Sequence, residues 1–596
     1  MPEQIQAFDT GADAVDWDLS ALFVNTEDLD RSLDRADSQA TEFAERYRDR
    51  VSRLTPTDLA AALAEFEAIQ DSLDRAGTYA FLDWSSNTED SARGARMQAV
   101  NERTILINQQ LIFFELELIH TAADRGSELT DHPALAKFHH YVEILGLRRK
   151  HVLSEAEERI VSLKSLSGAG AWSRFFDETL SAARFDLNGT SLTEQEILAK
   201  LYDSRRDVRR EASEVFTQGL RRHLKPLTFV FNTLLAEKVT DDRLRRFPHW
   251  LSSRNLSNEI SDAAVDALVG SITARYDLPQ RYYALKGKLL GLDELFDYDR
   301  YAPMHTSERR YTWSEARDTV LAAYRDFSPK MADVAEMFFE KRWIDAPIRP
   351  GKRSGAFSHR AVPQAHPYIL LNFTGNTRDV QTLAHELGHG VHQFLSNSLG
   401  SLQAGTPLTT AETASVFGEM LVFERLLGAE SDPTRRLSLL MSKIDDTMAT
   451  VFRQIAMNRF EDRIHRARRE KGELSPDGFS EFWMETQNEM FRGSVTLTEN
   501  YSVWWSYIPH FVHTPGYVYA YAFGELLVLA LYALFRAEPS GFVDRYLGLL
   551  SSGGSDWPHH LLEPMGVNLR DPEFWNRGLE EIEQLISKAE KLHSGS

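Results

Sequence analysis

Apolar residues recur at three- and four-residue spacing along most of this chain, which is the pattern of amphipathic helices. The spacing predicts a helix over residues 56–83 and further long helices over residues 97–122 and 435–469. The sequence shows no repeat of fixed period and no low-complexity tract. We therefore predict a mainly α fold for the 596 residues.

One short segment has the signals of a β-hairpin instead. Residues 183–193 read ARFDLNGTSLT, and the dipeptide Asn188-Gly189 between apolar residues favours a tight hairpin turn. We place a domain boundary after this hairpin. It separates a helical N-terminal region, residues 1–200, from a larger C-terminal domain, residues 201–596.

A second non-helical segment covers residues 349–376, where glycine and proline end the preceding helices. Within it, HPYILLNF is a strand candidate followed by the turn TGN. A helix is predicted to begin directly afterwards, with Asn376 or Thr377 as its N-cap and Asp379 in its first turn. The sequence thus places a small β element beside this helix.

Composition narrows the partners and the chemistry. A formal net charge of −21 at pH 7 should repel nucleic acid and anionic membranes, so we expect neither as a partner. The chain has no cysteine, which excludes disulfides and cysteine-ligated zinc. Any metal must therefore be bound by His, Asp or Glu.

Two segments bear on the location of the protein. MPEQIQAFDT at the start has no basic segment followed by an apolar one, so we expect no signal peptide. The most apolar run, residues 523–535, is too short to span a bilayer and carries Glu525, which indicates a buried helix. We expect a cytoplasmic protein.

The helix after the strand candidate contains His385-Glu386-Leu387-Gly388-His389. Residues four apart lie on one face of a helix, so two imidazoles can reach one ion. Glu386 is offset by about 100°, where a general base for a zinc-bound water must lie. With 19 histidines in the chain, this pattern arises by chance in roughly one such chain in twenty. A third ligand is needed to support the interpretation.

The third ligand is predicted from the spacing of acids. One zincin signature requires histidine at position 395, but the chain has Leu395 there, and we do not expect the nearby His392 to be a ligand. No Asp or Glu occurs over residues 387–411, and the first acid is Glu412, with Glu419 two helical turns further on. We predict Glu412 as the ligand and Glu419 as the partner of a ligating histidine.

An alternative for Glu412 stays open at this point. Thr409 and Glu412 have the spacing of a capping box, which is common at helix starts. We favour the ligand, because a distant helical glutamate after the HExxH motif is a joint coincidence.

The segment WWSYIPHFVHTPGYVYAYAFGE, residues 504–525, is dense in aromatic and histidine side chains. Trp504, Trp505 and Phe511 are expected to be core residues. Several polar tips remain, and a peptide-hydrolysing zinc site needs donors for the oxyanion of the tetrahedral intermediate. The candidates are His510, His513, Tyr517, Tyr519 and Tyr521. His510 and one or two of these tyrosines can supply such donors, and spacing alone does not choose among the tyrosines.

LAHELGH, AETASVFGEM and IPHFVHTPGYVYAYAFGE, in this order, resemble the thimet oligopeptidase family of zinc metallopeptidases, specifically its oligoendopeptidase F branch. GKRSGAFS, PYILLNFTGNTRDVQTLAHELGH and VDWDLSALF resemble the same branch, so the resemblance covers nearly the whole chain. It implies a large, almost wholly helical fold with two lobes, a deep substrate channel and zinc at the channel floor. The chain departs from the branch at Val512 and Gly516, where members often carry aromatic residues.

The resemblance also implies roles for individual residues. His385, His389 and Glu412 are implied as the ligands of one Zn²⁺ per chain, and Glu386 as the base and proton shuttle. His510 and a tyrosine are implied as transition-state donors; we favour Tyr521, then Tyr517.

A strand and a loop are implied to contact the substrate. The strand of residues 366–373 would pair with the substrate backbone by strand addition, and residues 351–358 are similar to a substrate-side loop. The implied substrate-binding residues are Gly355, Ala356, Tyr368 and Leu370.

These observations predict a cytoplasmic zinc endopeptidase that cleaves internal bonds of short, unfolded oligopeptides. Manganese or cobalt stays open, because a site of two histidines and one glutamate accepts several divalent ions. One alternative is an exopeptidase that removes dipeptides from the C-terminus. The alternative from another class is a non-catalytic peptide-binding protein.

Overall fold

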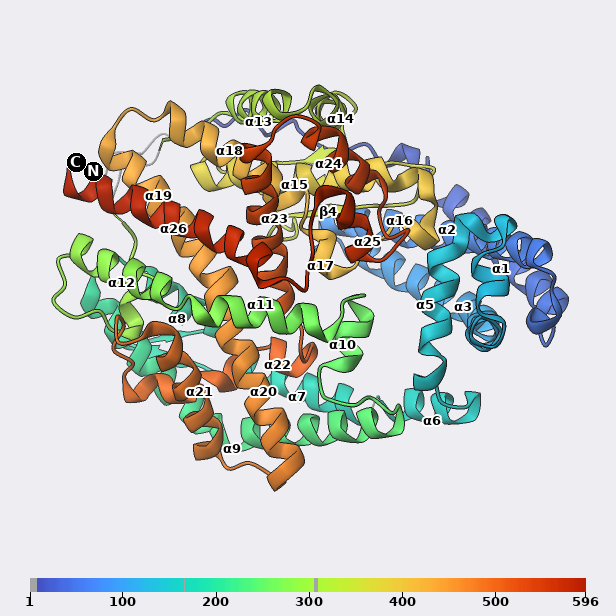
Figure 1. Cartoon of the computed structure of the whole chain (residues 1–596), viewed down its shortest axis with the longest axis horizontal. Helices are drawn as coiled ribbons and strands as arrows, with labels where there is room; N and C mark the ends of the chain where they lie inside the picture. The colour runs from blue at the N-terminus through green and yellow to red at the C-terminus, as the bar shows by residue number, and fades with distance from the viewer. Residues whose placement is uncertain (1–7, 166, 305–308, 596) are drawn as a thin grey trace. The chain divides into compact units, whose positions relative to one another are not determined.

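The computed structural model describes residues 8–165, 167–304 and 309–595. Most of the N-terminal MPEQIQAFDT, on which the expectation about a signal peptide rests, lies outside these residues. Helices make up most of the described chain and the strands are short (Figure 1). The prediction of a large, mainly helical fold is confirmed.

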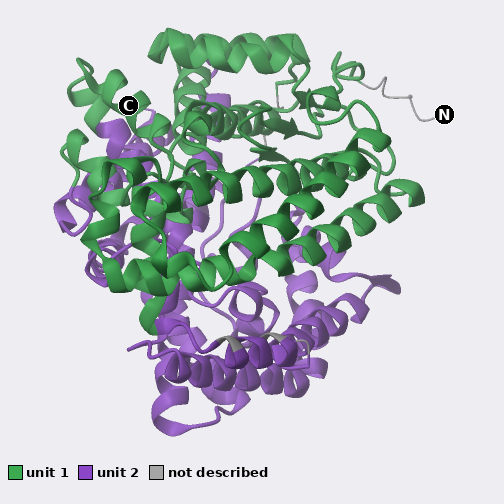
Figure 2. Cartoon of the chain, turned by 90° about the vertical axis from the view of Figure 1, so that its right-hand side faces the viewer, with its two compact units in different colours: residues 1–150, 308–429, 534–567 green, residues 151–307, 430–533, 568–596 purple. Residues whose placement is uncertain are grey.

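The chain forms two compact units, and each unit is assembled from three separate segments (Figure 2). Unit 1 consists of residues 1–150, 308–429 and 534–567, and unit 2 of residues 151–307, 430–533 and 568–596. The predicted boundary at residue 200 falls inside unit 2. The division into an N-terminal region, residues 1–200, and a C-terminal domain, residues 201–596, stays a prediction.

Unit 1 contains the helices α1 (Thr26–Tyr47), α2 (Pro56–Ser86), α3 (Ser91–Arg125), α4 (Ser127–Thr130), α5 (His139–Arg148), α13 (Trp313–Phe327), α14 (Pro329–Glu340), α15 (Thr377–Ser396), α16 (Ser401–Ala404), α17 (Leu408–Ala411), α18 (Ser415–Ala429), α24 (Phe542–Ser551) and α25 (Pro558–Leu562). The helices predicted over residues 56–83 and 97–122 are confirmed as α2 and α3. Helix α2 begins where predicted, because Thr55 caps the amide of Asp58 and Pro56 occupies its first position.

Unit 2 contains α6 (Glu155–Ser165), α7 (Ala169–Ala182), α8 (Glu194–Ala199), α9 (Arg206–Leu244), α10 (Ser252–Ser257), α11 (Asp262–Ala274), α12 (Asp277–Leu289), α19 (Pro433–Thr447), α20 (Gln454–Lys471), α21 (Pro476–Phe491), α22 (His510–His513) and α26 (Pro572–Ser594). The helix predicted over residues 435–469 corresponds to α19 and α20, joined by a π-helical turn, Met448–Arg453. The predicted aromatic core is confirmed, since Trp504, Trp505 and Phe511 are buried beside α9 and α21.

The predicted hairpin is present in unit 2. Strand β1 (Phe185–Leu187) pairs with β2 (Thr190–Leu192) in antiparallel register. Asn188 and Gly189 connect them with φ values of 56° and 80°. These left-handed conformations explain why the turn carries asparagine and glycine.

A three-stranded sheet lies in unit 1 beside α15. Its order is β3-β5-β4, where β3 (Ile344–Asp345) runs parallel and β4 (Phe357–His359) antiparallel to β5 (Tyr368–Leu370). The predicted strand is therefore present as β5, but it is short and central. Both of its edges are hydrogen-bonded to neighbours, so the expected strand addition by residues 366–373 is wrong. An unbroken apolar run such as YILL is typical of a strand that is buried on both faces.

Helix α23 (Tyr519–Ala537) contains the most apolar run of the chain. From the sequence we expected this run to be too short to span a bilayer. That expectation is wrong about the length, because the run lies in a helix of 19 residues that is long and apolar enough to cross a membrane. The expectation of a buried helix is confirmed, because 67% of its most apolar window is buried and core helices of soluble proteins pass the same test. Glu525 is buried with Lys443 3.6 Å away.

Candidate metal centre and its surroundings

Helix α15 is fixed at its start by a reciprocal pair of hydrogen bonds. Asn376 is the N-cap, and its side chain accepts from the amide of Asp379 at 2.9 Å. The Asp379 carboxylate in turn accepts from the backbone amide of Asn376 at 3.3 Å, and also from the amides of Thr374 at 2.6 Å and Gly375 at 2.8 Å. This capping box ties the helix to the turn after β5 and sets the position of the histidines two turns further on.

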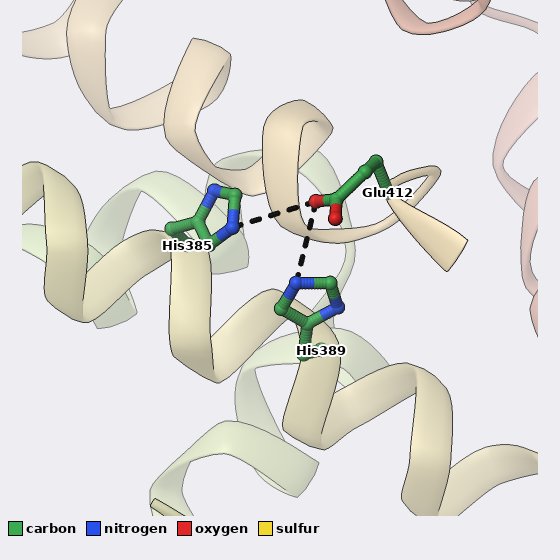
Figure 3. A group of neighbouring side chains, drawn as sticks. All are labelled: His385, His389 and Glu412. Carbon is green, nitrogen blue, oxygen red and sulfur yellow. Dashed lines mark ion pairs between the residues drawn. The ribbon is translucent and has the colours of Figure 1, made fainter. Parts of the chain in front are cut away.

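His385, His389 and Glu412 point toward one another in unit 1 (Figure 3). The Nε2 atoms of His385 and His389 lie 3.4 and 3.3 Å from the same carboxylate oxygen of Glu412. Ligand atoms of a tetrahedral zinc with bonds of about 2.0–2.1 Å are separated by about 3.3–3.4 Å. These three side chains therefore fit a divalent cation, and they are the one group of this kind among the described residues.

Glu419 approaches the other side of the His385 ring. Its carboxylate lies 3.4 Å from Nδ1 of His385, opposite the nitrogen that faces Glu412. We expected Glu412 and Glu419 to lie on one helix, and this is wrong. Helix α17 ends at Ala411 and α18 begins at Ser415, so Glu412 lies between the two helices and Glu419 lies in α18. A carboxylate at Nδ1 fixes the ring and the tautomer that leaves Nε2 free to bind a metal.

The capping-box alternative for Glu412 is wrong. The residue before α17 is Pro407, which makes no side-chain cap hydrogen bond, and Thr409 is buried within the helix. The Glu412 carboxylate instead accepts from the hydroxyl of Ser415 at 2.6 Å and faces the two imidazoles.

Glycine inside the HExxH motif allows the two segments to meet. A Cβ on Gly388 would lie 2.4 Å from the carbonyl oxygen of Ala414 and 2.6 Å from Cα of Ser415, which are both backbone atoms. Only glycine permits this approach of α15 to the chain that carries Glu412. This packing explains why the motif has glycine at position 388, and it brings the carboxylate of Glu412 to the two histidines.

The electrostatics of the group favour a bound positive charge. Burial opposes protonation of His385, but the carboxylates of Glu419, Glu412 and Glu386 raise its pKa to about 9. Burial likewise opposes ionisation of Glu412, but His389, His385 and Ser415 lower its pKa to about 2. Since only neutral imidazole ligates a metal, a cation would replace the proton that these carboxylates attract.

Glu386 lies beside the two histidines, and its environment differs from that of Glu412. Its side chain is 7% exposed, and burial together with Glu412 raises its pKa, while His385, His389 and the amide of Ser358 oppose the rise. A carboxyl group with a raised pKa can both accept and return a proton near neutral pH.

Glu386 lines a cavity of about 330 Å³ in unit 1. Its lining residues are Ala356, Phe357, Ser358, Arg360, Glu386, His389, His392, Gln393, Thr406 and Ala411. Of the predicted substrate-binding residues, Ala356 lines this cavity and Gly355 precedes it with a φ of 81°. Tyr368 and Leu370 do not; both are fully buried in β5, and the hydroxyl of Tyr368 donates to the backbone of Asp18 at 3.2 Å.

Arg360, another lining residue, was missed from the sequence, and Ser358 was expected only as the last residue of the substrate-side loop, residues 351–358. In the run FSHR, of which Phe357–His359 form β4, the alternation of side chains would have placed Ser358 and Arg360 on one face. His392 also lines the cavity but lies outside the metal-binding group, as expected. Burial, with Arg360 and His389 nearby, lowers the pKa of His392 to about 3, so it is neutral.

His510, Tyr517 and Tyr521 form a cluster in unit 2. Nε2 of His510 lies 3.1 Å from the hydroxyl of Tyr521, and the ring of Tyr517 stacks parallel to His510 with centroids 6.1 Å apart. Burial, with Arg453 and His513 nearby, lowers the pKa of His510. The cluster can therefore present a neutral imidazole and a phenol. The role of these residues as transition-state donors stays a prediction.

The other two polar candidates of this segment have structural partners. The hydroxyl of Tyr519 is buried and bonds to the side chains of Asn255 at 2.8 Å and Asn258 at 2.9 Å. His513 is exposed and lies 2.8 Å from Asp177. The structure thus separates Tyr519 from Tyr517 and Tyr521, which spacing alone did not.

Comparison with known proteins identifies the family. The sequence profile of peptidase family M3 matches residues 199–581, which include all of the side chains of the metal group. The chain belongs to peptidase family M3. A second profile, that of oligopeptidase F, matches residues 117–185 of this M3 peptidase.

Individual M3 relatives cover almost the whole chain. Oligopeptidase PepF of Bacillus subtilis is 27% identical, over 96% of this chain and 88% of its own length. The oligoendopeptidase F homolog of Borreliella burgdorferi is 25% identical, over 93% of this chain and 94% of its own.

Solved structures share the fold. A crystal structure from Chlamydophila abortus superposes with a TM-score of 0.87 at 23% identity, covering 98% of this chain and 100% of that protein. Oligoendopeptidase F from Enterococcus faecium gives a TM-score of 0.70 at 20% identity, covering 95% of this chain and 100% of its own. The helical architecture of this M3 peptidase is therefore that of the oligoendopeptidase F proteins.

Proposed function

We propose that this protein is a zinc-dependent endopeptidase that hydrolyses internal bonds of short, unfolded oligopeptides. The observation that carries the proposal is the convergence of His385, His389 and Glu412 at tetrahedral ligand spacing, with buried Glu386 adjacent. Membership of peptidase family M3 and the names of the relatives support the same reaction. We propose one zinc per chain and a cytoplasmic location.

Each residue of the group has a defined task in this proposal. His385, His389 and Glu412 hold the zinc, and Glu419 orients His385. When bound, the zinc supplies Lewis acidity to the scissile carbonyl and lowers the pKa of a water. Glu386 accepts the proton of the attacking water and delivers it to the leaving amine, a double role that suits its raised pKa.

His510 and Tyr521 are proposed as donors to the oxyanion of the tetrahedral intermediate, with Tyr517 as the next candidate. Their support is the contact of 3.1 Å between His510 and Tyr521, together with a lowered pKa of His510 that leaves its ring neutral. A preorganised donor of this kind stabilises charge that develops only in the transition state.

The substrate backbone is proposed to pair with β4 in place of β5. The amide of Ile369 in β5 donates to the carbonyl of Trp343, directly before β3, at 2.9 Å, so it points away from β4. Ser358 in β4 lies opposite Ile369, and its backbone amide and carbonyl therefore point to the outer edge of β4. Ala356, two residues before Ser358, lines the cavity with Glu386. The Ser358 carbonyl at this edge accepts from the side chain of Gln393 at 3.4 Å, so an extended peptide that adds to the edge would displace this contact.

The proposal is tested with Glu386→Gln. We expect the variant to retain zinc and to lose turnover of a quenched fluorogenic peptide by at least about 10²–10⁴-fold, because the amide cannot carry the proton. Zinc is measured by mass spectrometry of the purified protein, and a chelator should abolish the wild-type activity. Substantial hydrolysis by Glu386→Gln with zinc bound would overturn the assignment.

A peptide blocked at both ends separates the endopeptidase from the alternatives. Cleavage of the blocked peptide, followed by mass spectrometry of the products, supports the endopeptidase. Release of dipeptides only from peptides with a free C-terminus would indicate an exopeptidase. Binding without cleavage by the zinc-loaded protein would indicate a peptide-binding protein.

A further inference from the structure

Arg360 extends from the end of β4 into the cavity beside the metal-binding group. Side chains alternate along a strand, so Arg360 shares a face with Ser358, whose hydroxyl donates to Gln393 of α15 at 2.9 Å. Phe357 and His359 alternate with them, and both rings pack against Phe81, with centroids 5.5 and 5.6 Å apart. Arg360 therefore lines the same cavity as Glu386 and His389.

The guanidinium of Arg360 has no partner among the described residues. Its Nη1 atom is buried without a hydrogen bond, and no carboxylate of the described chain forms an ion pair with it. Burial alone lowers the pKa of Arg360 to about 10, and no acidic group opposes this shift. The buried cations of the neighbouring segment differ, because Arg349 and Lys352 both pair with Asp345.

A buried cation without a partner is costly, and it is unexpected in a chain with 88 acids and 67 basic residues. The side chain is not sealed in, because part of its surface remains exposed to solvent. The neighbouring His392 is neutral and cannot replace an anion. An anion that enters the cavity would supply the missing charge.

We propose that Arg360 binds a carboxylate group of the peptide substrate and so makes the enzyme selective for it. This inference rests on the proposed function, since it concerns the substrate of the same site. A guanidinium matches the planar geometry of a carboxylate with two parallel hydrogen bonds. The cavity of about 330 Å³ is at the small end for ligand sites and fits one side chain or one chain terminus. The carboxylate is that of an acidic side chain near the scissile bond or that of the C-terminus.

Matched peptides test the proposal and separate these two sources. One pair carries Glu or Gln at each position flanking the scissile bond, and the other carries a free or amidated C-terminus. We expect wild-type kcat/KM to favour the carboxylate member of one pair by about 10- to 100-fold, as for a buried charge-assisted hydrogen bond. Arg360→Gln should reduce this ratio to about one, and Arg360→Lys should keep part of it. Arg317→Gln, which removes an exposed arginine that pairs with Asp318, is the matched control and should leave the ratio unchanged.

A ratio near one for both pairs in the wild type, or a ratio that survives in Arg360→Gln, would overturn the proposal. A Glu/Gln ratio that is lost in the variant assigns the site to an acidic side chain, and a lost acid/amide ratio assigns it to the C-terminus. If Arg360→Gln does not fold, Arg360→Lys takes its place: a reduced ratio supports the proposal, and an unchanged ratio overturns it.

Calorimetric binding of the same peptides to zinc-loaded Glu386→Gln, with and without Arg360→Gln, needs no turnover. If the wild type cleaves none of the peptides but the binding preference still depends on Arg360, the proposed function fails and the carboxylate site stands. If neutral peptides are cleaved without any preference, only the carboxylate site fails.

Discussion

Glu412 is the residue on which the metal site depends most. Because its carboxylate faces both imidazoles at 3.3–3.4 Å, Glu412→Ala should abolish retention of zinc through gel filtration against a chelator. Ser415→Ala removes only a hydrogen bond to Glu412 and should weaken zinc binding by about 10- to 100-fold. Glu424→Ala, in the same helix α18 but outside the metal-binding group, is the control and should keep the metal. Wild-type zinc content in Glu412→Ala would remove this residue from the ligand set.

At the residue scale the sequence predicted those side chains whose roles depend on local spacing. His385, Glu386 and His389 follow from helix geometry, and the acid-free interval pointed to Glu412. The tyrosines did not follow, because the role of Tyr519 depends on Asn255 and Asn258, which lie far away in sequence. Arg360 did not follow either, since an arginine in a sequence carries no sign that its partner is absent.

The close approach of α15 to the start of α18 makes Gly388 sensitive at the element scale. Gly388→Ala should destabilise the protein by about 1–3 kcal/mol, because its Cβ meets the backbone of Ala414 and Ser415 and neither can move aside cheaply. It should also weaken zinc binding, since the displaced chain carries Glu412. Gly428→Ala in α18, with no atom within 4 Å of the added Cβ, should instead be neutral or stabilising by up to about 1 kcal/mol. Thermal unfolding and zinc content of both variants check this, and equal effects would contradict it.

Helix α20 holds the loop before α23 through a buried carboxyl group. Glu461 accepts from the amide of Gly516 at 2.8 Å, and its second oxygen has no partner among the described residues. Gly516 has a φ of 76°, which residues other than glycine rarely adopt, and a Cβ there would lie 2.7 Å from the side chain of Leu251. This packing gives a physical reason for the departure from the family pattern at this position.

The same carboxyl group predicts a pH dependence of stability. Burial raises the pKa of Glu461 from 4.5 to about 8, against the amide of Gly516 and the charge of Arg254. Between these values the unfolded chain has released the proton while the folded chain keeps it, so stability from this group falls as pH rises from about 4.5 to 8. Glu461→Gln lacks this loss, so its stability relative to the wild type should increase over the same range. Urea unfolding at pH 5, 6.5 and 8 measures the difference, and parallel curves would contradict it.

Elements were predicted well where one local signal was sufficient. The capped α2 and the Asn188-Gly189 hairpin are examples. Strand β5 shows the limit of local signals. Its apolar run predicted a strand, but whether its edges were free depended on β3 and β4, which a local pattern does not show. The break before α18 at Glu412 was missed for a similar reason, since it is fixed by the contact with Gly388.

At the scale of the whole molecule the interleaving of the two units was not predictable from the sequence. Contacts within unit 1 join distant segments, such as the bond of 3.0 Å from Trp557 to Glu143 across 414 residues. No boundary in composition marks where the chain leaves one unit for the other, because both are built from helices of the same kind. The large helical fold was predictable because the helical pattern runs through nearly all of the chain.

The size of these units also predicts what removal of the metal does to the molecule. Zinc-dependent small domains unfold without metal because they lack a core. Here both units have extensive buried cores, and the ligands are held by helix α15, its capping box and the contact at Gly388. Chelation should therefore abolish activity while the helical circular dichroism at 25 °C stays unchanged. The Tm should fall by only several degrees, in proportion to the binding free energy that zinc adds to the folded state. Addition of zinc should restore both activity and Tm, and loss of helicity on chelation would show that the metal is required for the fold.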